Sequence, residues 1–74
     1  NNHMNKERQQ EIENFAKENE INLEVLQAVI DEFEYSGIFP NELIGKSINA
    51  PFLKKISLIE NVKVFIKNLL RKYL

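Results

Sequence analysis

The spacing of hydrophobic residues predicts an amphipathic helix in the middle of the chain, from Asn22 to about Tyr35. Hydrophobic side chains fall there at i, i+1, i+4, i+5 and i+8, a spacing that places them on one face of an α-helix. They are Val25, Leu26, Val29, Ile30 and Phe33. Asn22 is a favourable N-cap residue, and Gly37 is well placed to end the helix in the left-handed conformation.

A second amphipathic helix is expected to close the chain, beginning at Ser57. Ser57 and Glu60 match the capping box, in which the serine oxygen accepts a backbone amide proton and the glutamate reaches back to the cap. The hydrophobic residues that follow share one face at about 100° per residue. They are Leu58, Val62, Phe65, Ile66, Leu69 and Tyr73. The basic residues of this helix step by four along its solvent side.

The beginning of the chain is more polar. Residues 5–19 favour a helix with few hydrophobic anchors, and the spacing of these anchors forms a narrow stripe. The anchors are Ile12, Phe15 and Ala16. Residues 1–4 read Asn-Asn-His-Met, and His-Met is what a common restriction site at a start codon encodes. We interpret them as a probable cloning remnant and leave them out of the fold. Residues 5–74 are then a single helical domain, taken as a fragment of a larger protein.

Two short stretches connect the predicted helices. A short helix is expected from Asn41 to Ile44, with Gly45 as its stop. Residues 46–55 show little periodicity and are interpreted as an ordered loop held by its hydrophobic side chains, which are Ile48, Phe52 and Leu53. The predicted fold class is therefore all-α, a small helical bundle of three main helices plus one short helix.

Composition agrees with a small globular domain. Hydrophobic residues make up 43% and charged residues 28% of the 74 positions, which is ordinary for a folded protein. A chain of this length has room for one modest core. It lacks cysteine, which excludes disulfides and thiolate metal sites. No apolar run approaches the roughly 20 residues of a membrane span, so no membrane partner is expected.

Charge is unevenly divided along the chain. Residues 5–42 carry ten acidic and three basic side chains, a net charge of −7, whereas residues 43–74 carry seven basic and one acidic, a net charge of +6. A basic surface of this kind suits nucleic acid or an acidic partner. The simpler alternative is that the two halves fold onto each other and partly neutralise, or that their charges are only solvated.

Motifs for catalysis are missing from the chain. Gly45-Lys46-Ser47 lacks the earlier glycine of a phosphate-binding loop, and we interpret it as a helix stop followed by a polar loop. The sole histidine, His3, lies in the presumed remnant, so neither a histidine base nor a zinc site is predicted. The acidic residues of 20–34 resemble a solvated helix face. We predict no catalytic residue, no metal site and no cofactor in this domain.

Two features of the closing helix are candidates for partner binding. Its basic side chains, extended by the two lysines that precede it, form a ridge that suits a phosphate or an acidic protein surface. A valine lies in the polar arc of the same helix, and hydrophobic residues exposed in this way suggest docking to a neighbour. The candidate contacts to a partner or to DNA are Lys54, Lys55, Lys63, Val64, Lys67 and Arg71. Stacking on DNA bases is disfavoured, because the aromatic residues of this helix lie on its buried face.

Three segments carry a resemblance to a known family. They are the helix end at residues 29–37, the short helix at residues 41–44 that leads to Pro51, and the closing helix at residues 58–73. In this order they resemble the C-terminal helical domain of the R (restriction, or motor) subunit of type I restriction-modification enzymes. The likeness covers the chain from Ile21 onward, and residues 5–20 add nothing to it.

The resemblance implies a parent protein that is an ATP-dependent DNA translocase and endonuclease, a cytoplasmic hydrolase of a restriction system that uses ATP and Mg. Its motor and nuclease domains would lie upstream. The domain itself is expected to be non-catalytic and to assemble the R subunit with the methyltransferase and specificity subunits, reaching DNA through that complex. The alternative is a free-standing helical nucleic-acid-binding domain.

Overall fold

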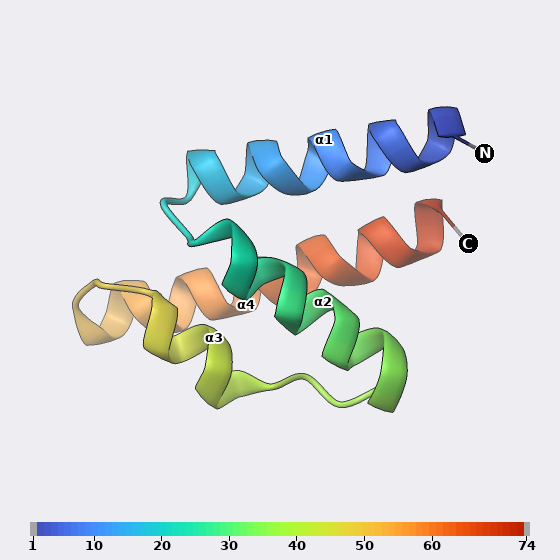
Figure 1. The fold of residues 1–74 in the computed structure, drawn as a ribbon. Coiled ribbons are helices and arrows are strands. Elements are labelled where there is room, and N and C mark those ends of the chain that lie inside the picture. Colours follow the sequence, from blue (N-terminus) through green and yellow to red (C-terminus); the bar gives the residue numbers. More distant parts are fainter. Residues whose placement is uncertain (1, 74) are drawn as a thin grey trace.

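Four helices make up the part of the chain that the structure, a computed structural model, describes: the backbone of residues 2–73 and the side chains of residues 5–73. They are α1 (Asn2–Glu18), α2 (Leu23–Ser36), α3 (Asn41–Ser47) and α4 (Phe52–Lys72), and no strand occurs among these residues (Figure 1). The prediction of an all-α bundle with three main helices and one short helix is confirmed.

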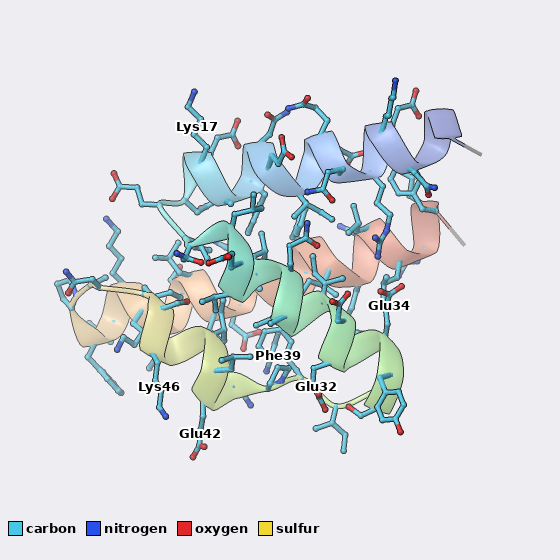
Figure 2. The ribbon with its side chains drawn as sticks, viewed as in Figure 1. Lys17, Glu32, Glu34, Phe39, Glu42 and Lys46 are labelled. Carbon is cyan, nitrogen blue, oxygen red and sulfur yellow. The ribbon has the colours of Figure 1, made fainter. Side chains whose placement is uncertain are left out.

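The helices are arranged around α4, the longest of them. α1 runs alongside the C-terminal half of α4 in the opposite direction, so that the two ends of the chain lie on the same side of the molecule (Figure 1). α2 crosses in front of α4, and α3 lies over the first turns of α4. Charged side chains such as Lys17, Glu42 and Lys46 point away from the bundle (Figure 2).

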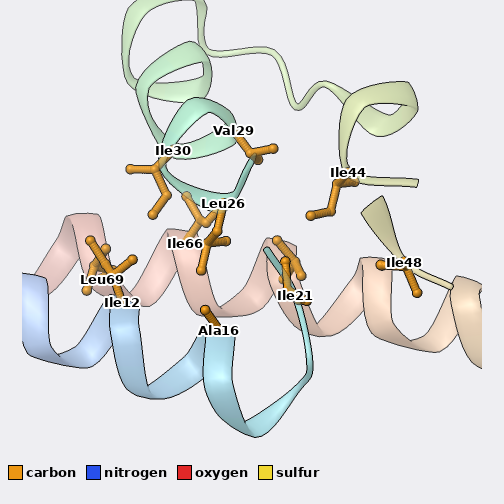
Figure 3. Packing of buried hydrophobic residues seen from close by; sticks show 11 residues of the cluster. Ile12, Ala16, Ile21, Leu26, Val29, Ile30, Ile44, Ile48, Ile66 and Leu69 are labelled. Atoms are coloured by element: carbon orange, nitrogen blue, oxygen red, sulfur yellow. The ribbon is translucent and has the colours of Figure 1, made fainter. Parts of the chain in front are cut away.

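The core is one cluster of aliphatic side chains contributed by every helix (Figure 3). Phe15 and Phe65 extend it between α1 and α4, with stacked rings whose centroids are 4.0 Å apart. The hydrophobic faces that the sequence predicts for α1, α2 and α4 are confirmed, each with some members only half-buried. The buried members are Ile12, Ala16, Ile21, Leu26, Val29, Ile30, Ile44, Ile48, Val62, Ile66 and Leu69.

The predicted boundaries of α2 are confirmed in atomic detail. The Asn22 side chain accepts a hydrogen bond from the backbone N–H of Val25 at 3.0 Å, which satisfies a donor that the helix leaves open. At the other end Gly37 has φ 75°, and its N–H donates to the Phe33 carbonyl at 2.8 Å. A left-handed residue closes the helix here, and glycine adopts that conformation without steric cost.

The predicted start of α4 at Ser57 is wrong. The helix begins at Phe52, with Pro51 in the cap position, and the Lys55 N–H already donates to the Pro51 carbonyl at 2.8 Å. Residues 52–56 contain no glycine or proline, so no helix-breaking residue separates them from the helix that follows, and they extend it by more than one turn. Ser57 is an exposed residue inside the helix.

The expected loop at residues 46–55 is confirmed only for residues 48–51, because residues 46–47 belong to α3 and residues 52–55 to α4. Of its three expected anchors only Ile48 is buried, at 4% exposure. Phe52 and Leu53 are 73% and 79% exposed. The sequence pattern did not distinguish hydrophobic residues that pin a loop from hydrophobic residues on the outside of a helix.

The short helix α3 does not stop at Gly45 but continues to Ser47. Ile44 and Ile48 are both buried, and they are four residues apart, so a helical turn between them keeps both side chains on the same side. The Ser47 hydroxyl donates to the Ile44 carbonyl at 2.8 Å. A glycine inside a helix costs up to about 1 kcal/mol, which the burial of two isoleucines exceeds.

The first helix includes residues that the sequence pattern excluded. α1 begins at Asn2, so leaving residues 1–4 out of the fold is wrong from residue 2 onward. Their origin as a cloning remnant stays a prediction. The helix itself and its anchors are confirmed, with Ile12 and Ala16 buried and Phe15 half-buried.

Candidate interaction surfaces on helix α4

The outward face of α4 carries hydrophobic side chains that the rest of the described chain leaves uncovered. Leu53 is 79% exposed and Val64 is 57% exposed, and helical spacing places both on one stripe together with Lys67 and Arg71. Two more exposed residues, Phe52 at 73% and Ile56 at 43%, widen this stripe at the start of the helix. We call Leu53, Ile56, Val64, Lys67 and Arg71, together with Phe52, the outward face.

Sequence analysis finds Val64, Lys67 and Arg71 of this face but misses its hydrophobic beginning. The lack of periodicity in residues 46–55 predicts a loop that packs Phe52 and Leu53 on the core, so these two residues are not among the candidate contacts. The signal was present in the absence of any helix-breaking residue after Pro51. A helix that starts at Phe52 places Leu53 on the side opposite to Ile66, where it faces solvent.

Lys63 and Lys67 flank a hollow between the end of α2 and the middle of α4. The hollow has a volume of about 300 Å³ and is lined by Phe33, Gly37, Phe39, Lys63, Ile66 and Lys67. Its lining contains no acidic side chain. We call it the basic hollow, since two lysines and an apolar floor make up its wall.

The two lysines of the basic hollow have different surroundings. The Lys63 ammonium lies 5.4 Å from the centroid of the Phe39 ring and 3.5 Å from a carboxylate oxygen of Glu60. Lys67 is exposed, and no acidic side chain of residues 5–73 pairs with it. Lys63 is therefore held partly against the protein, whereas the Lys67 ammonium is available to a ligand.

Lys54 lies at a different place from the other candidate lysines. It lines a second hollow of about 350 Å³ at the opposite end of the bundle, whose wall also contains Glu18 and Glu20. Lys55 is half-buried at the same end of α4. The six candidate contact residues therefore do not share one surface, because helical geometry turns Lys54 away from Lys67.

A polar cluster joins the two ends of the chain. The Lys72 ammonium lies 2.8 Å from a carboxylate oxygen of Glu11, and the Tyr73 hydroxyl donates to the same oxygen. The hydrogen bond from Lys72, followed by the one from Tyr73, lowers the pKa of Glu11 below its ordinary value of 4.5. The same contacts raise the pKa of Lys72 and of Tyr73, in each case chiefly through the hydrogen bond to Glu11.

This cluster contains the one direct ion pair, among residues 5–73, between the acidic and basic halves of the chain. Of the three ion pairs among residues 5–73, only Lys72–Glu11 joins the basic half to the acidic half. Arg8 pairs with Glu34 inside the acidic half, and Lys63 pairs with Glu60 inside the basic half. Direct pairing between the halves thus occurs at the end of α4, and the positive charge of its middle section faces solvent.

Comparison with known proteins identifies the family. Within the described residues, no helix is long and apolar enough to cross a membrane, and no three potential metal ligands are grouped together. No curated protein and no solved structure matches the chain. A family model described as type I restriction and modification enzyme, subunit R C terminal, matches residues 1–73, including the residues before Ile21 that the sequence resemblance left out. Since this match spans nearly the whole chain, the protein belongs to the family of C-terminal domains of the R subunit of type I restriction-modification enzymes.

Proposed function

We propose that this domain assembles the R subunit onto the methyltransferase core of a type I restriction-modification enzyme. A subunit family implies a multi-subunit enzyme, and assembly of such an enzyme requires surfaces on its subunits that neighbours cover. The observation that carries the proposal is the uncovered hydrophobic row on the outward face of α4, where Phe52, Leu53 and Val64 are each more than half exposed; exposed Ser57 and Glu60 interrupt the row between Leu53 and Val64.

Physical reasoning supports an interface at this face. Burial of apolar surface yields about 25 cal/mol per Å², and several large hydrophobic side chains exposed on one side of a small domain are a mark of a protein interface. Lys67 and Arg71 lie at one end of the row, where rim charges guide the encounter with an acidic surface. A hydrophobic row with a basic end fits a protein partner better than it fits DNA, which is bound chiefly through its phosphates.

The wider expectations for the parent enzyme belong to the same proposal. The R subunit would supply ATP- and Mg-dependent translocation and cleavage from other domains, in the cytoplasm, and would reach DNA through the methyltransferase and specificity subunits. This chain would contribute binding and no catalytic group. A free-standing nucleic-acid-binding domain is the rival, and it predicts direct, salt-sensitive binding of the chain to duplex DNA.

Competition by the isolated chain tests the proposal. Labelled R subunit is titrated with its methyltransferase complex, and the 74-residue chain is added in increasing amounts. We expect the chain to displace the R subunit, and we expect the double variant Leu53→Asp/Val64→Asp to compete about tenfold less well or worse, equal to about 1.4 kcal/mol.

The control is Tyr35→Asp, because Tyr35 is 91% exposed on α2, away from the outward face. This variant should compete as the unmodified chain does, and circular dichroism confirms that all variants are folded. Failure of the unmodified chain to compete, or equal loss with Tyr35→Asp, contradicts the proposal. Binding of the chain to duplex DNA with no effect on assembly favours the rival.

A further inference from the structure

We infer that the basic hollow binds an acidic segment of a partner protein, with one large apolar side chain of that segment inserted against Phe33, Phe39 and Ile66. The inference deepens the proposed function, because it states the chemistry of the partner segment. It rests on the proposed function for one point, the identity of the protein that supplies this segment. The carrying observation is an apolar floor beside two lysines, in a wall that contains no acid.

The shape and the floor of the hollow define the apolar part of the ligand. At about 300 Å³ it has room for one large side chain, and the aromatic rings of Phe33 and Phe39 together with Ile66 line it. Ile38, next to Phe39 in the chain, is 71% exposed but does not line the hollow. Apolar surface that is uncovered at a concave site gains free energy when a hydrophobic side chain displaces its water.

The two lysines define the charged part. Lys63 and Lys67 are one helical turn apart on α4, so their ammonium groups suit two carboxylates that are also about one turn apart on a partner helix. Lys67 has no ion-pair partner among residues 5–73, and Lys63 shares only a 3.5 Å contact with exposed Glu60. A partner segment with one large apolar side chain flanked by Asp or Glu therefore matches both the apolar floor of the hollow and the two lysines at its edge.

A second copy of this chain fits the hollow poorly, although it carries such a segment. Tyr35 is 91% exposed and is preceded by Asp31, Glu32 and Glu34. Tyr35 and Phe33 are two residues apart on α2 and so point to opposite sides of the helix. One copy inserting Tyr35 into the next would produce an open chain of copies rather than a closed pair. A different protein is thus the occupant that the geometry favours.

Nucleic acid also fits less well than an acidic protein. Phosphate groups pair with lysine without needing an apolar floor, and the aromatic ring beside the two lysines, that of Phe39, already carries Lys63 above it. The apolar side chains under the lysines would be covered by a protein anchor and left in water by a phosphate backbone.

Binding of defined peptides to the chain tests the inference. The probe is the peptide Ala-Glu-Glu-Leu-Ala-Asp-Glu-Ala, acetylated at its N-terminus and amidated at its C-terminus. It is titrated into the isotope-labelled chain, and chemical shifts of the chain are monitored by nuclear magnetic resonance. We expect shifts concentrated at Phe33, Gly37, Phe39 and Ile66. Changing the leucine of the peptide to serine, or its acids to amides, should weaken binding about fivefold or more, because each change removes one half of the recognition.

Charge reversal on the chain provides the matched comparison. Lys67→Glu should weaken binding of the peptide about fivefold or more, whereas Lys17→Glu, the same change on exposed α1, should leave it unchanged. Equal loss with both variants, unchanged binding with Lys67→Glu, or no binding of the peptide overturns the inference. Displacement of the peptide by a short DNA duplex would also overturn the inference. Chemical-shift changes at the hollow that grow with the concentration of the chain alone would do the same, because they would indicate a second copy as the occupant.

The outcome also separates this inference from the proposed function. If the chain competes for the methyltransferase complex but does not bind the peptide, assembly stands and the hollow is not its contact. If the peptide binds at the hollow and the chain does not compete, the hollow is a site for an acidic segment of another protein, and the assembly proposal falls.

Discussion

The two ends of the bundle differ in how completely they cover their hydrophobic side chains. At one end, α1, α2 and the C-terminal half of α4 enclose Leu26, Ile30 and Ile66 (Figure 3). The Phe15–Phe65 stack and the Glu11 cluster lie between α1 and α4 at this end. We call this the closed end. At the other end α3 buries Ile44 and Ile48, yet Phe52 and Leu53 remain in solvent. We call this the open end.

The difference shows that the two halves of α4 contribute unequally to the core, although the outward face and the basic hollow both reach into its C-terminal half. α4 is a continuous helix from Phe52 to Lys72, but its C-terminal half has α1 and α2 beside it and its first turns have only short α3. Hydrophobic residues in the first half of α4 therefore find fewer neighbours. They are available to a partner for the same reason that they contribute little to the fold.

Truncation of one leucine at each end gives the largest expected contrast. Leu26→Ala removes a fully buried side chain of the closed end and should lower the free energy of unfolding by about 2–5 kcal/mol. Leu53→Ala removes a side chain that is 79% exposed and should change it by less than about 0.5 kcal/mol. Urea denaturation measures both, and similar losses for the two variants would contradict the division into a closed and an open end.

Removal of polar side chains at two helix positions gives a smaller contrast. Asn22→Ala deletes the side chain that caps α2 and should cost about 1 kcal/mol. Ser57→Ala lies inside α4 without a capping bond and should be neutral or slightly stabilising, since alanine is the better helix former. Thermal unfolding distinguishes the two. A loss of about 1 kcal/mol with Ser57→Ala would restore Ser57 as a cap and contradict the helix start at Phe52.

A glycine inside α3 offers a way to strengthen the open end. Gly45→Ala should raise the free energy of unfolding by about 0.5–1 kcal/mol, because alanine favours the helix that Gly45 already adopts. An added Cβ would meet Ile59 Cδ1 at 3.9 Å, an ordinary contact. Gly37→Ala is the control of opposite sign, since φ 75° disfavours alanine there. If Gly45→Ala destabilised the chain in the same denaturation experiment, the extension of α3 through Gly45 would be wrong.

The Glu11 cluster predicts the smallest effect, a pH dependence of the closed end. The folded-state pKa of Glu11 is lowered, so its contribution to stability is complete above the unfolded-state value and is lost as the pH falls through the folded value. Because the Glu11 side chain is 36% exposed, we expect only a few tenths of a kcal/mol, lost as the pH falls below the ordinary pKa of 4.5. Glu11→Gln should remove this part of the acid dependence.

The alkaline side of the same cluster has the opposite sign. The pKa values of Lys72 and Tyr73 are raised, so what they contribute is present below their unfolded-state values and is lost as the pH rises through the folded ones. Stability curves against pH for Glu11→Gln and the unmodified chain that remain parallel at both extremes would show that the cluster contributes nothing.

Sequence by itself determined the elements whose signals are local. The hydrophobic spacing and the two capping residues of α2 fixed its face and both ends, because a cap and a periodic stripe act within the helix that carries them. The buried face of α4 followed from the same periodicity. The family resemblance rested on this order of elements, and the family match confirms it.

Tertiary structure decided what depends on neighbours distant in the chain. Gly45 carries a local signal to end a helix, but α3 continues past it because this buries Ile44 and Ile48. Ser57 carries a local signal to begin a helix, but α4 already begins at Phe52, with unbroken backbone hydrogen bonding. Whether Leu53 is core or surface, and whether Lys54 and Lys67 share a surface, depends on which helices lie beside α4. The pairing of Glu11 with Lys72 spans 61 positions, and only the packing of α1 against α4 brings these two residues together.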